Sequence, residues 1–160
     1  MLIGFTCSTF DLLHAGHVKM LEYAAQHCDS LWVGLQTQVP DRPEKNAPIQ
    51  TVYERYIQLE CLKRVHKIIP YESEDDLINL LVTLPIPHIR FVGYEYVDKY
   101  FTGKNLYNDP LTGGPELLTD RKLMYTPREH SWSSTNLRQR VAKAERIKEG
   151  NIADVVKAKE

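Results

Sequence analysis

The sequence LIGFT at residues 2–6, followed directly by CSTFDLLHAGH at residues 7–17, decides the fold of this chain. The first run is short, apolar and partly β-branched, bounded by a turn, which predicts a buried strand. From Val18 to Ala25 apolar residues recur at helical spacing without a breaker, which predicts a first helix. The chain therefore opens with a strand that passes at once into a helix.

Two histidines and a glycine lie where that strand passes into that helix. The first backbone N–H groups of a helix have no intrahelical partner and lie at the positive end of its dipole, so a phosphate is stabilised there. His14 and His17 are three residues apart, so both imidazoles share one face of the first turn and can donate to one phosphate. Gly16 leaves room for a ligand to approach. A zinc site completed by Cys7 and a pair of ordinary surface histidines are alternatives that stay open.

Strands and helices alternate along the rest of the chain. The pattern predicts further strands over residues 31–35, 66–69, 88–92 and 123–125, with Pro70 ending the third of the five. It predicts helices over residues 51–64 and 73–84 and from Ser133 or Ser134 onward. Thr51 with Glu54 and Ser73 with Asp76 are capping boxes that begin the middle two helices.

This alternation predicts an α/β fold with a single-domain, Rossmann-like, doubly wound parallel sheet of about five strands and helices on both faces. We expect the domain to occupy residues 1–145, with residues 146–160 as its C-terminal helical tail. In such sheets ligands bind beyond the carboxyl ends of the strands, where the strand order reverses. Residues 7–9, 93–95 and 127–128 each follow a predicted strand, so we expect them to converge at that edge.

Composition and charge limit the class of protein. The chain has 160 residues, is 42% hydrophobic and 26% charged, and carries a net charge of −1, which argues against a general nucleic-acid binder. No apolar run approaches the ~20 residues of a membrane span. The three cysteines are scattered and odd in number, which argues against a disulfide framework and fits a reducing, cytoplasmic location.

Two polar segments do not have the pattern of a core. Residues 36–50 contain three prolines, and residues 102–115 contain three glycines and two prolines. Long loops inside a compact domain are usually functional or disordered. We interpret residues 36–50 as a flexible cover over the site and residues 102–115 as an insertion whose role stays open. A plain surface loop is the alternative for each segment.

A second motif, REHSWSST at residues 128–135, precedes the last predicted helix. Its hydroxyls and unpaired N–H groups at a helix start repeat the device of the first motif, with a guanidinium whose planar donors suit phosphate oxygens. Two such helix starts at one sheet edge can hold a triphosphate from both sides. The alternative is that Ser133, Ser134 and Thr135 form only an N-cap.

The two motifs together resemble a known family. Residues 9–17, TFDLLHAGH, resemble the HxGH signature of the cytidylyltransferases, most closely glycerol-3-phosphate cytidylyltransferase. Residues 128–135 resemble the family motif RTxGISTT and keep Arg128, Ser133 and Thr135. The resemblance implies a nucleotidyltransferase that transfers CMP from CTP to a phosphorylated polyol such as glycerol 3-phosphate, giving a CDP-alcohol and pyrophosphate. It also implies Mg²⁺ bound with the nucleotide, no dedicated metal ligands, and a homodimer.

The resemblance assigns roles to individual residues. The catalytic group is His14, His17, Lys45 and Arg128. The nucleotide-binding group is Ser8, Thr9, Phe10, Asp11, Gly16, Gly93, Glu95, Arg128, Ser131, Trp132, Ser133, Ser134 and Thr135. The acceptor phosphate is assigned to Lys45, Arg55 and Lys63. Asp11 either positions a histidine or a metal-bound water, or serves the helix only as an N-terminal acid.

The chain departs from the family pattern at several positions, and two rival functions stay open. Ser8 replaces a usual glycine, and Ser131 and Trp132 replace a glycine and an aliphatic residue. Acidic residues at 72–76 stand where a glycerol phosphate would favour a lysine. One rival is an adenylyltransferase acting on a sugar phosphate such as a heptose phosphate. Residues 46–49 of this chain resemble a loop of that family. The other is a catalytically weak nucleotide-binding or regulatory homologue.

Overall fold

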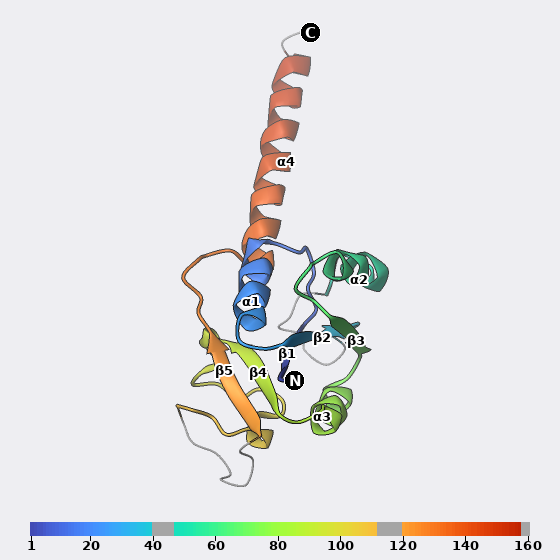
Figure 1. Ribbon diagram of the computed structural model, residues 1–160. Coiled ribbons are helices and arrows are strands. Elements are labelled where there is room, and N and C mark those ends of the chain that lie inside the picture. The colour runs from blue at the N-terminus through green and yellow to red at the C-terminus, as the bar shows by residue number, and fades with distance from the viewer. Residues whose placement is uncertain (40–46, 112–119, 158–160) are drawn as a thin grey trace.

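The computed structural model describes residues 1–39, 47–111 and 120–157. Its strands form one sheet in the order β3-β2-β1-β4-β5, and every neighbouring pair is parallel (Figure 1). The strands are β1 Ile3–Ser8, β2 Ser30–Gln36, β3 Lys67–Tyr71, β4 His88–Gly93 and β5 Arg121–Thr126. The helices are α1 Ala15–Ala25, α2 Val52–Glu60, α3 Glu74–Thr83 and α4 Ser134–Lys157, with 3₁₀ turns η1 Tyr94–Tyr96 and η2 Lys104–Leu106. The predicted five-stranded, Rossmann-like parallel sheet is confirmed.

Helices cover both faces of the sheet. In Figure 1, α1 and α2 lie above the sheet and α3 lies below it. Both predicted capping boxes begin their helices: the Thr51 hydroxyl accepts the N–H of Glu54, and the Ser73 hydroxyl accepts the N–H of Asp76. The N-terminal boundaries of α2 and α3 are therefore set by local hydrogen bonds.

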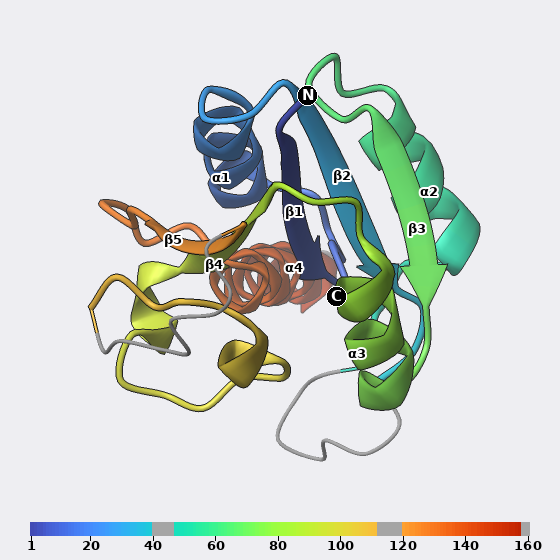
Figure 2. The ribbon, with the colours of Figure 1, turned by 60° about the horizontal axis from the view of Figure 1, so that its bottom comes forward.

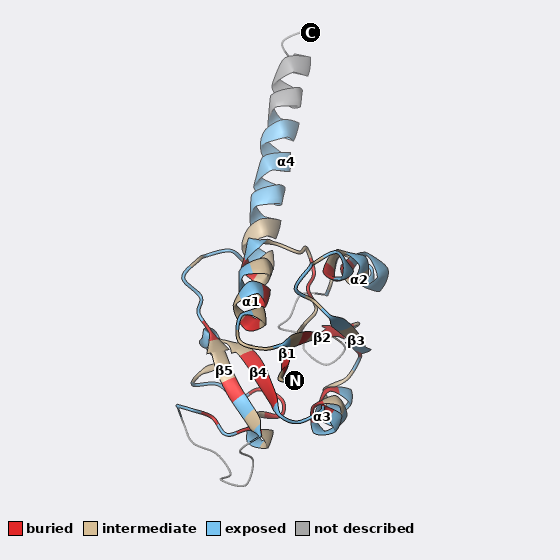
Figure 3. Ribbon diagram, in the orientation of Figure 1, coloured by how far each residue is buried: buried red, intermediate tan, exposed pale blue. Residues whose placement is uncertain are grey.

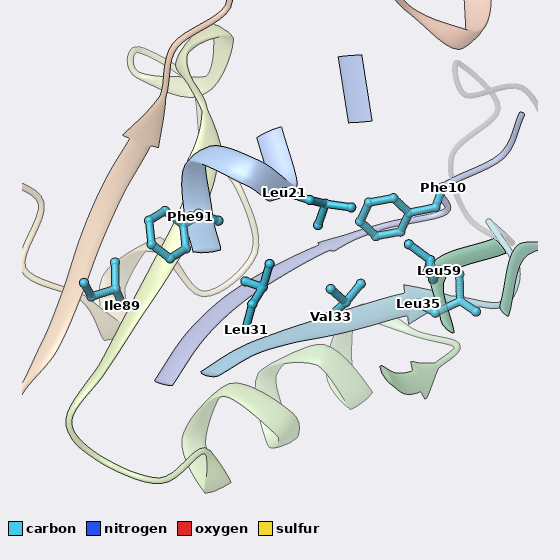
Figure 4. Packing of buried hydrophobic residues seen from close by; sticks show 9 residues of the cluster. Phe10, Leu21, Leu31, Val33, Leu35, Leu59, Ile89 and Phe91 are labelled. Carbon is cyan, nitrogen blue, oxygen red and sulfur yellow. The ribbon is translucent and has the colours of Figure 1, made fainter. Parts of the chain in front are cut away.

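The core between the sheet and the helices α1 and α2 is aliphatic and aromatic. Figure 4 shows side chains of β2 and β4 meeting those of α1 and α2 across this layer. Leu31, Val33 and Leu35 alternate along β2 and are fully buried, as one face of a strand requires. Phe10, from the segment after β1, packs in the same layer.

The second core lies between the sheet and α3, and it includes a segment that the sequence did not place in a core. Phe101 and Tyr107 are buried there with Leu77 and Leu81 of α3. The interpretation of residues 102–115 as lying outside the core is wrong for residues 102–109, because the aromatic side chains that flank Thr102 and η2 cover the α3 face of the sheet. Residues 112–119 lie outside the described residues.

The strand order changes direction at β1, and this sets the position of the site. From β1 the chain runs outward through β2 and β3, then returns to add β4 and β5 on the other side of β1 (Figure 2). The connections that follow β1 and β4 therefore diverge and leave a crevice at the carboxyl ends of these strands.

Several element boundaries differ from the sequence prediction, among them the ends of β3 and α2. Pro70 lies within β3, opposite Leu35, rather than ending the strand. β3 is an edge strand, and an edge strand has one side on which the missing N–H of a proline costs no sheet hydrogen bond. The helix α2 ends at Glu60, four residues before the predicted end.

The helix α4 extends away from the sheet (Figure 1) and is continuous across the predicted boundary at residue 145. Residues 139–150 are all exposed (Figure 3).

Among the described helices, none combines the length and apolarity needed to cross a membrane. The homodimer stays a prediction. Cys7, Cys28 and Cys61 are free thiols.

Candidate active site

A cleft of about 500 Å³ opens at the carboxyl ends of β1 and β4. Its walls come from the β1–α1 connection, the segment after β4, and the segment between β5 and α4. Both motifs therefore line one cleft, as the sequence predicted from their positions after strands.

His14 forms the N-cap of α1. Its Nδ1 atom accepts the backbone N–H of Gly16 at 3.0 Å. Because Nδ1 is the acceptor in this contact, the proton of the neutral ring belongs on Nε2. The rings of His14 and His17 stack with centroids 3.9 Å apart and planes 20° from parallel. The two imidazoles thus form one pair at the helix start.

Burial and mutual proximity keep these imidazoles uncharged. Burial, together with neighbouring His14, lowers the pKa of His17 to about 3, although Asp11 opposes the shift. Burial is also the first cause of a lowered pKa at His14, with His130 and Arg128 adding to it. Near neutral pH both rings are therefore neutral donors.

Gly16 is the point at which the two motifs touch. A Cβ atom there would lie 2.8 Å from the backbone oxygen of Trp132 and 3.0 Å from Cε1 of His130. The oxygen belongs to backbone and cannot rotate away. The absence of a side chain at residue 16 is therefore what lets the second motif pack on the start of α1.

The second motif combines one ion pair with local hydrogen bonds. Arg128 donates to Glu95 at 2.7 Å, and both side chains are partly exposed at the cleft. The Ser133 hydroxyl accepts the N–H of Asn136 at 3.0 Å, which caps α4. The ring of His130 stacks on Trp132 with centroids 4.9 Å apart. Trp132 is exposed, so it does not fill the core.

Asp11 joins three separate parts of the chain. Its side chain is buried, and Oδ1 accepts the N–H groups of Ile49 at 3.0 Å and Gln50 at 2.9 Å. Its Oδ2 atom accepts from Arg138 of α4. The Ser134 hydroxyl donates to the backbone oxygen of Asp11 at 2.9 Å. Asp11 thus holds the β1–α1 connection against residues 49–50 and the start of α4.

The connection held by Asp11 has an unusual backbone. Phe10 has a φ of +49° and Leu12 a φ of +50°, in the left-handed region that L-residues with bulky side chains rarely adopt. The N–H of Leu12 donates to Oε1 of Gln50 at 2.6 Å, and Phe10 is fully buried. Tertiary contacts therefore hold a conformation that local preference disfavours.

Arg55 points into the protein rather than into the cleft. Its guanidinium donates to the backbone oxygens of Thr9 at 2.8 Å, Gln36 at 2.6 Å, Thr37 at 2.8 Å and Gln50 at 3.2 Å. The residue is 1% exposed. A direct contact with an acceptor phosphate, predicted from the resemblance, does not fit this placement, because burial and four carbonyls already engage the side chain. Its contacts make Arg55 a positioning residue for the loops after β1 and β2.

The other predicted site residues divide into those that line the cleft and those that do not. The cleft is lined by Ser8, Thr9, Asp11, His14, Gly16, His17, Gly93, Glu95, Arg128, Trp132, Ser133, Ser134 and Thr135. Phe10 lies behind it in the core, Ser131 does not line it, and Lys63 is exposed elsewhere. Lys45 lies outside the described residues. The roles given to these residues stay predictions.

Several residues that line the cleft were missed, among them His130, Arg138 and Arg90. His130 stood inside the quoted motif, and its buried Nδ1 has no partner among the described residues. Arg138 follows Ser134 by four residues, so helical spacing could have placed both on one face. Arg90, in the middle of β4, carried no motif signal.

The predicted zinc alternative does not fit the described residues. No group of three histidine, cysteine or acidic side chains in residues 1–39, 47–111 and 120–157 is placed to hold a metal ion. The Asp11 carboxylate is occupied by backbone N–H groups and by Arg138. Asp11 therefore acts as a structural anchor in this geometry.

Comparisons with known proteins agree with this fold. The family model described as Cytidylyltransferase-like matches residues 5–140. A bifunctional protein HldE of Rhodospirillum rubrum is 37% identical over 123 residues, which are 75% of this chain and 24% of that protein. One from Acidiphilium cryptum is 38% identical over 103 residues, 63% of this chain and 21% of that protein. The chain spans about a quarter of the length of these relatives.

A solved structure shares the fold. The lipopolysaccharide core biosynthesis protein from Thermoplasma volcanium GSS1 superposes with a TM-score of 0.62 at 21% identity, covering 81% of this chain and 99% of that one.

We predict that Arg55→Met destabilises the protein by about 3–5 kcal/mol, because four backbone oxygens lose a buried, charged donor. Urea unfolding measures the loss. Arg64→Met, which removes an exposed arginine just beyond α2, is the matched control and should change the unfolding free energy by less than about 0.5 kcal/mol. Equal effects of the two variants would contradict the positioning role.

We also predict that His17 makes stability fall as pH falls. Its folded pKa of about 3 lies below the ordinary value of 6.5, so between these values the unfolded state binds a proton that the folded state excludes. In urea unfolding from pH 5.5 to 4.5, the wild type should lose up to about 1.4 kcal/mol per pH unit more than His17→Gln. The comparison with His17→Gln separates this histidine from His14 and His88, whose pKa values burial also lowers. Parallel slopes would exclude a neutral, buried His17.

Proposed function

The chain belongs to the cytidylyltransferase-like family, and on that premise we propose that it is a nucleotidyltransferase. It transfers a nucleoside monophosphate from a nucleoside triphosphate to the phosphate of a small polyol or sugar and releases pyrophosphate. The observation that carries the proposal is the contact at Gly16, which brings the starts of α1 and α4 to one cleft. Two helix N-termini at one cleft favour a polyphosphate ligand.

The histidine pair supplies donors to the reacting phosphate. His14 keeps its proton on Nε2, because Nδ1 accepts from Gly16. Neutral imidazoles beside the α-phosphate donate hydrogen bonds that strengthen as charge grows on its oxygens. Neither ring needs to lose or gain a proton for this role.

Transfer then requires alignment more than covalent help. An oxygen of the acceptor phosphate attacks the α-phosphorus in line, while the bond from the α-phosphorus to the bridging oxygen breaks and pyrophosphate leaves with that electron pair. Arg128 holds the β- and γ-phosphates, exchanging its contact with Glu95 for phosphate oxygens. The start of α4 supports the same phosphates through Thr135 and its backbone N–H groups.

We place Mg²⁺ with the nucleotide rather than in a protein site. The described residues offer no trio of metal ligands, and Mg²⁺ commonly binds substrate phosphates and water. When bound, the ion neutralises charge on the triphosphate. The protein's own contribution is the pair of helix starts, the histidine pair and Arg128.

Two nucleotides are candidates for the donor. The resemblance of residues 9–17 and 128–135 to glycerol-3-phosphate cytidylyltransferase favours CTP. The resemblance of residues 46–49 to the loop of sugar-phosphate adenylyltransferases favours ATP. A third possibility concerns the function rather than the donor: the chain is a catalytically weak nucleotide-binding homologue. This is suggested by Ser8, which lines the cleft where the family has glycine.

The test is pyrophosphate release from each nucleoside triphosphate with a panel of phosphorylated alcohols and sugars. Release with CTP supports cytidylyl transfer, and release with ATP supports adenylyl transfer. Tight nucleotide binding by calorimetry without release from any pair would overturn the transferase proposal in favour of a binding protein.

We predict that His17→Ala lowers the rate of pyrophosphate release ~10²- to 10³-fold, because a donor to the transition state is lost. Circular dichroism and thermal melting check that the variant is folded. His27→Ala is the control, since His27 does not line the cleft. A folded His17→Ala enzyme that kept more than about a tenth of the wild-type rate would be incompatible with the assigned role.

A further inference from the structure

The cleft continues past the β1–β4 edge onto the face of the sheet that α3 covers. This part, here called the α3-side lobe, has no role in the chemistry described above. Its lining side chains are Cys7, Tyr71, Glu74, Leu77, Arg90, Phe101 and Thr102. It contains a buried arginine, a carboxylate, a phenol and a hydroxyl.

Arg90 is the central residue of this lobe. It lies three residues before the last residue of β4, so its Cα lies ~10 Å from the strand end. It is 4% exposed, and its Nη1 donates to the backbone oxygen of Thr102. The guanidinium carbon is 5.1 Å from the centroid of the Phe101 ring and 5.7 Å from that of Tyr107.

The chain after β4 folds closely around this guanidinium. Gly103 has a φ of +73°, and a Cβ there would lie 3.1 Å from Nη1 of Arg90. The left-handed turn therefore needs glycine in order to bring Thr102 onto Arg90. This turn belongs to the segment whose role the sequence left open.

The hydrogen bonding of Arg90 is incomplete within the described chain. Its Nε atom is buried and has no partner among the described residues. A buried donor without an acceptor lowers the stability of the folded state, and so does a buried guanidinium. If residue 90 had only a structural role, an apolar side chain would be favoured there. A donor of this kind in a cleft wall fits an oxygen of a bound ligand.

The Glu74 carboxylate balances the positive charge of Arg90 inside the lobe, and Thr102 connects the two side chains. The backbone oxygen of Thr102 accepts from Arg90, and the hydroxyl of Thr102 donates to the Glu74 carboxylate. Burial raises the pKa of Tyr71, so its phenol stays protonated. The lobe therefore offers donors and acceptors of nearly balanced charge, which suits uncharged hydroxyl groups better than a second anion.

We propose that the α3-side lobe binds the hydroxyl-bearing end of the acceptor, with Arg90 donating to its oxygens and Glu74 accepting from its hydroxyls. This inference rests on the proposed function. The Arg90 Nε donor, the Glu74 carboxylate and the Tyr71 phenol come from β4, α3 and β3, three different elements around the lobe. A sugar phosphate with at least three hydroxyls can engage all three groups, so we expect a sugar phosphate rather than glycerol phosphate as the acceptor.

The experiment compares acceptors and variants in the pyrophosphate-release assay, using the full chain and the nucleotide that supports release. The acceptors are glycerol 3-phosphate, 3-phosphoglycerate and aldose 1-phosphates of five to seven carbons with deoxy analogues. The variants are Glu74→Gln, Arg90→Lys and Arg90→Gln. Asp75→Asn, exposed in the same first turn of α3, is the control.

We expect an aldose phosphate to exceed glycerol 3-phosphate in kcat/KM. Glu74→Gln should raise the KM for that sugar ~10- to 100-fold while the KM for nucleotide changes less than about twofold, because the lost contact is to the acceptor alone. Asp75→Asn should match the wild type. Because Arg90 is buried, its variants are read only where thermal melting shows a folded protein, and Glu74→Gln otherwise carries the test.

The other outcomes overturn the inference in distinguishable ways. Preference for 3-phosphoglycerate would mean that Arg90 binds a second anion. Equal use of glycerol 3-phosphate, or an unchanged sugar KM in a folded Glu74→Gln enzyme, would leave the lobe with a structural role while transfer itself stands. Nucleotide binding without release from any acceptor would remove the proposed function, and this inference with it.

Discussion

The buried carboxylate of Asp11 is the interaction on which the site depends. A carboxylate removed from water needs charged or N–H partners, and Asp11 finds them in Ile49, Gln50 and Arg138. Those partners come from parts of the chain 38 to 127 residues away. A single carboxylate therefore holds three segments in place: the connection from Phe10 to Leu12, the segment before α2 and the start of α4.

The polyphosphate site of the proposed function does not depend on a basic surface. The imidazoles are neutral and Arg128 is paired with Glu95, so the positive potential comes mainly from two helix starts. This explains how a chain of net charge −1 fits a polyphosphate ligand. The β1–β4 crevice opens toward both faces of the sheet, so one ligand can meet the histidine pair while another reaches the α3-side lobe.

Much of the fold was predictable because the signals that carry it are local. Strand–helix alternation gave the parallel sheet, and the capping boxes at Thr51 and Ser73 gave two helix starts. Prediction failed at Pro70, because only the strand order shows that β3 is an edge strand, where a proline is tolerated. It failed again over residues 102–109, where glycine and polar residues suggested a loop although the flanking aromatic side chains are buried.

The sequence by itself determined that two helix starts, each with polar side chains suited to phosphate, follow strands of one parallel sheet, because spacing and capping residues are local features of consecutive residues. Only the tertiary structure decided what isolated charged residues do. Arg55 turns inward because carbonyls of residues 9, 36, 37 and 50 converge on it. Arg90 lines a lobe of the cleft because a turn at Gly103 closes over β4. Whether a charge is buried depends on which distant segments surround it, and no local pattern in the sequence specifies that.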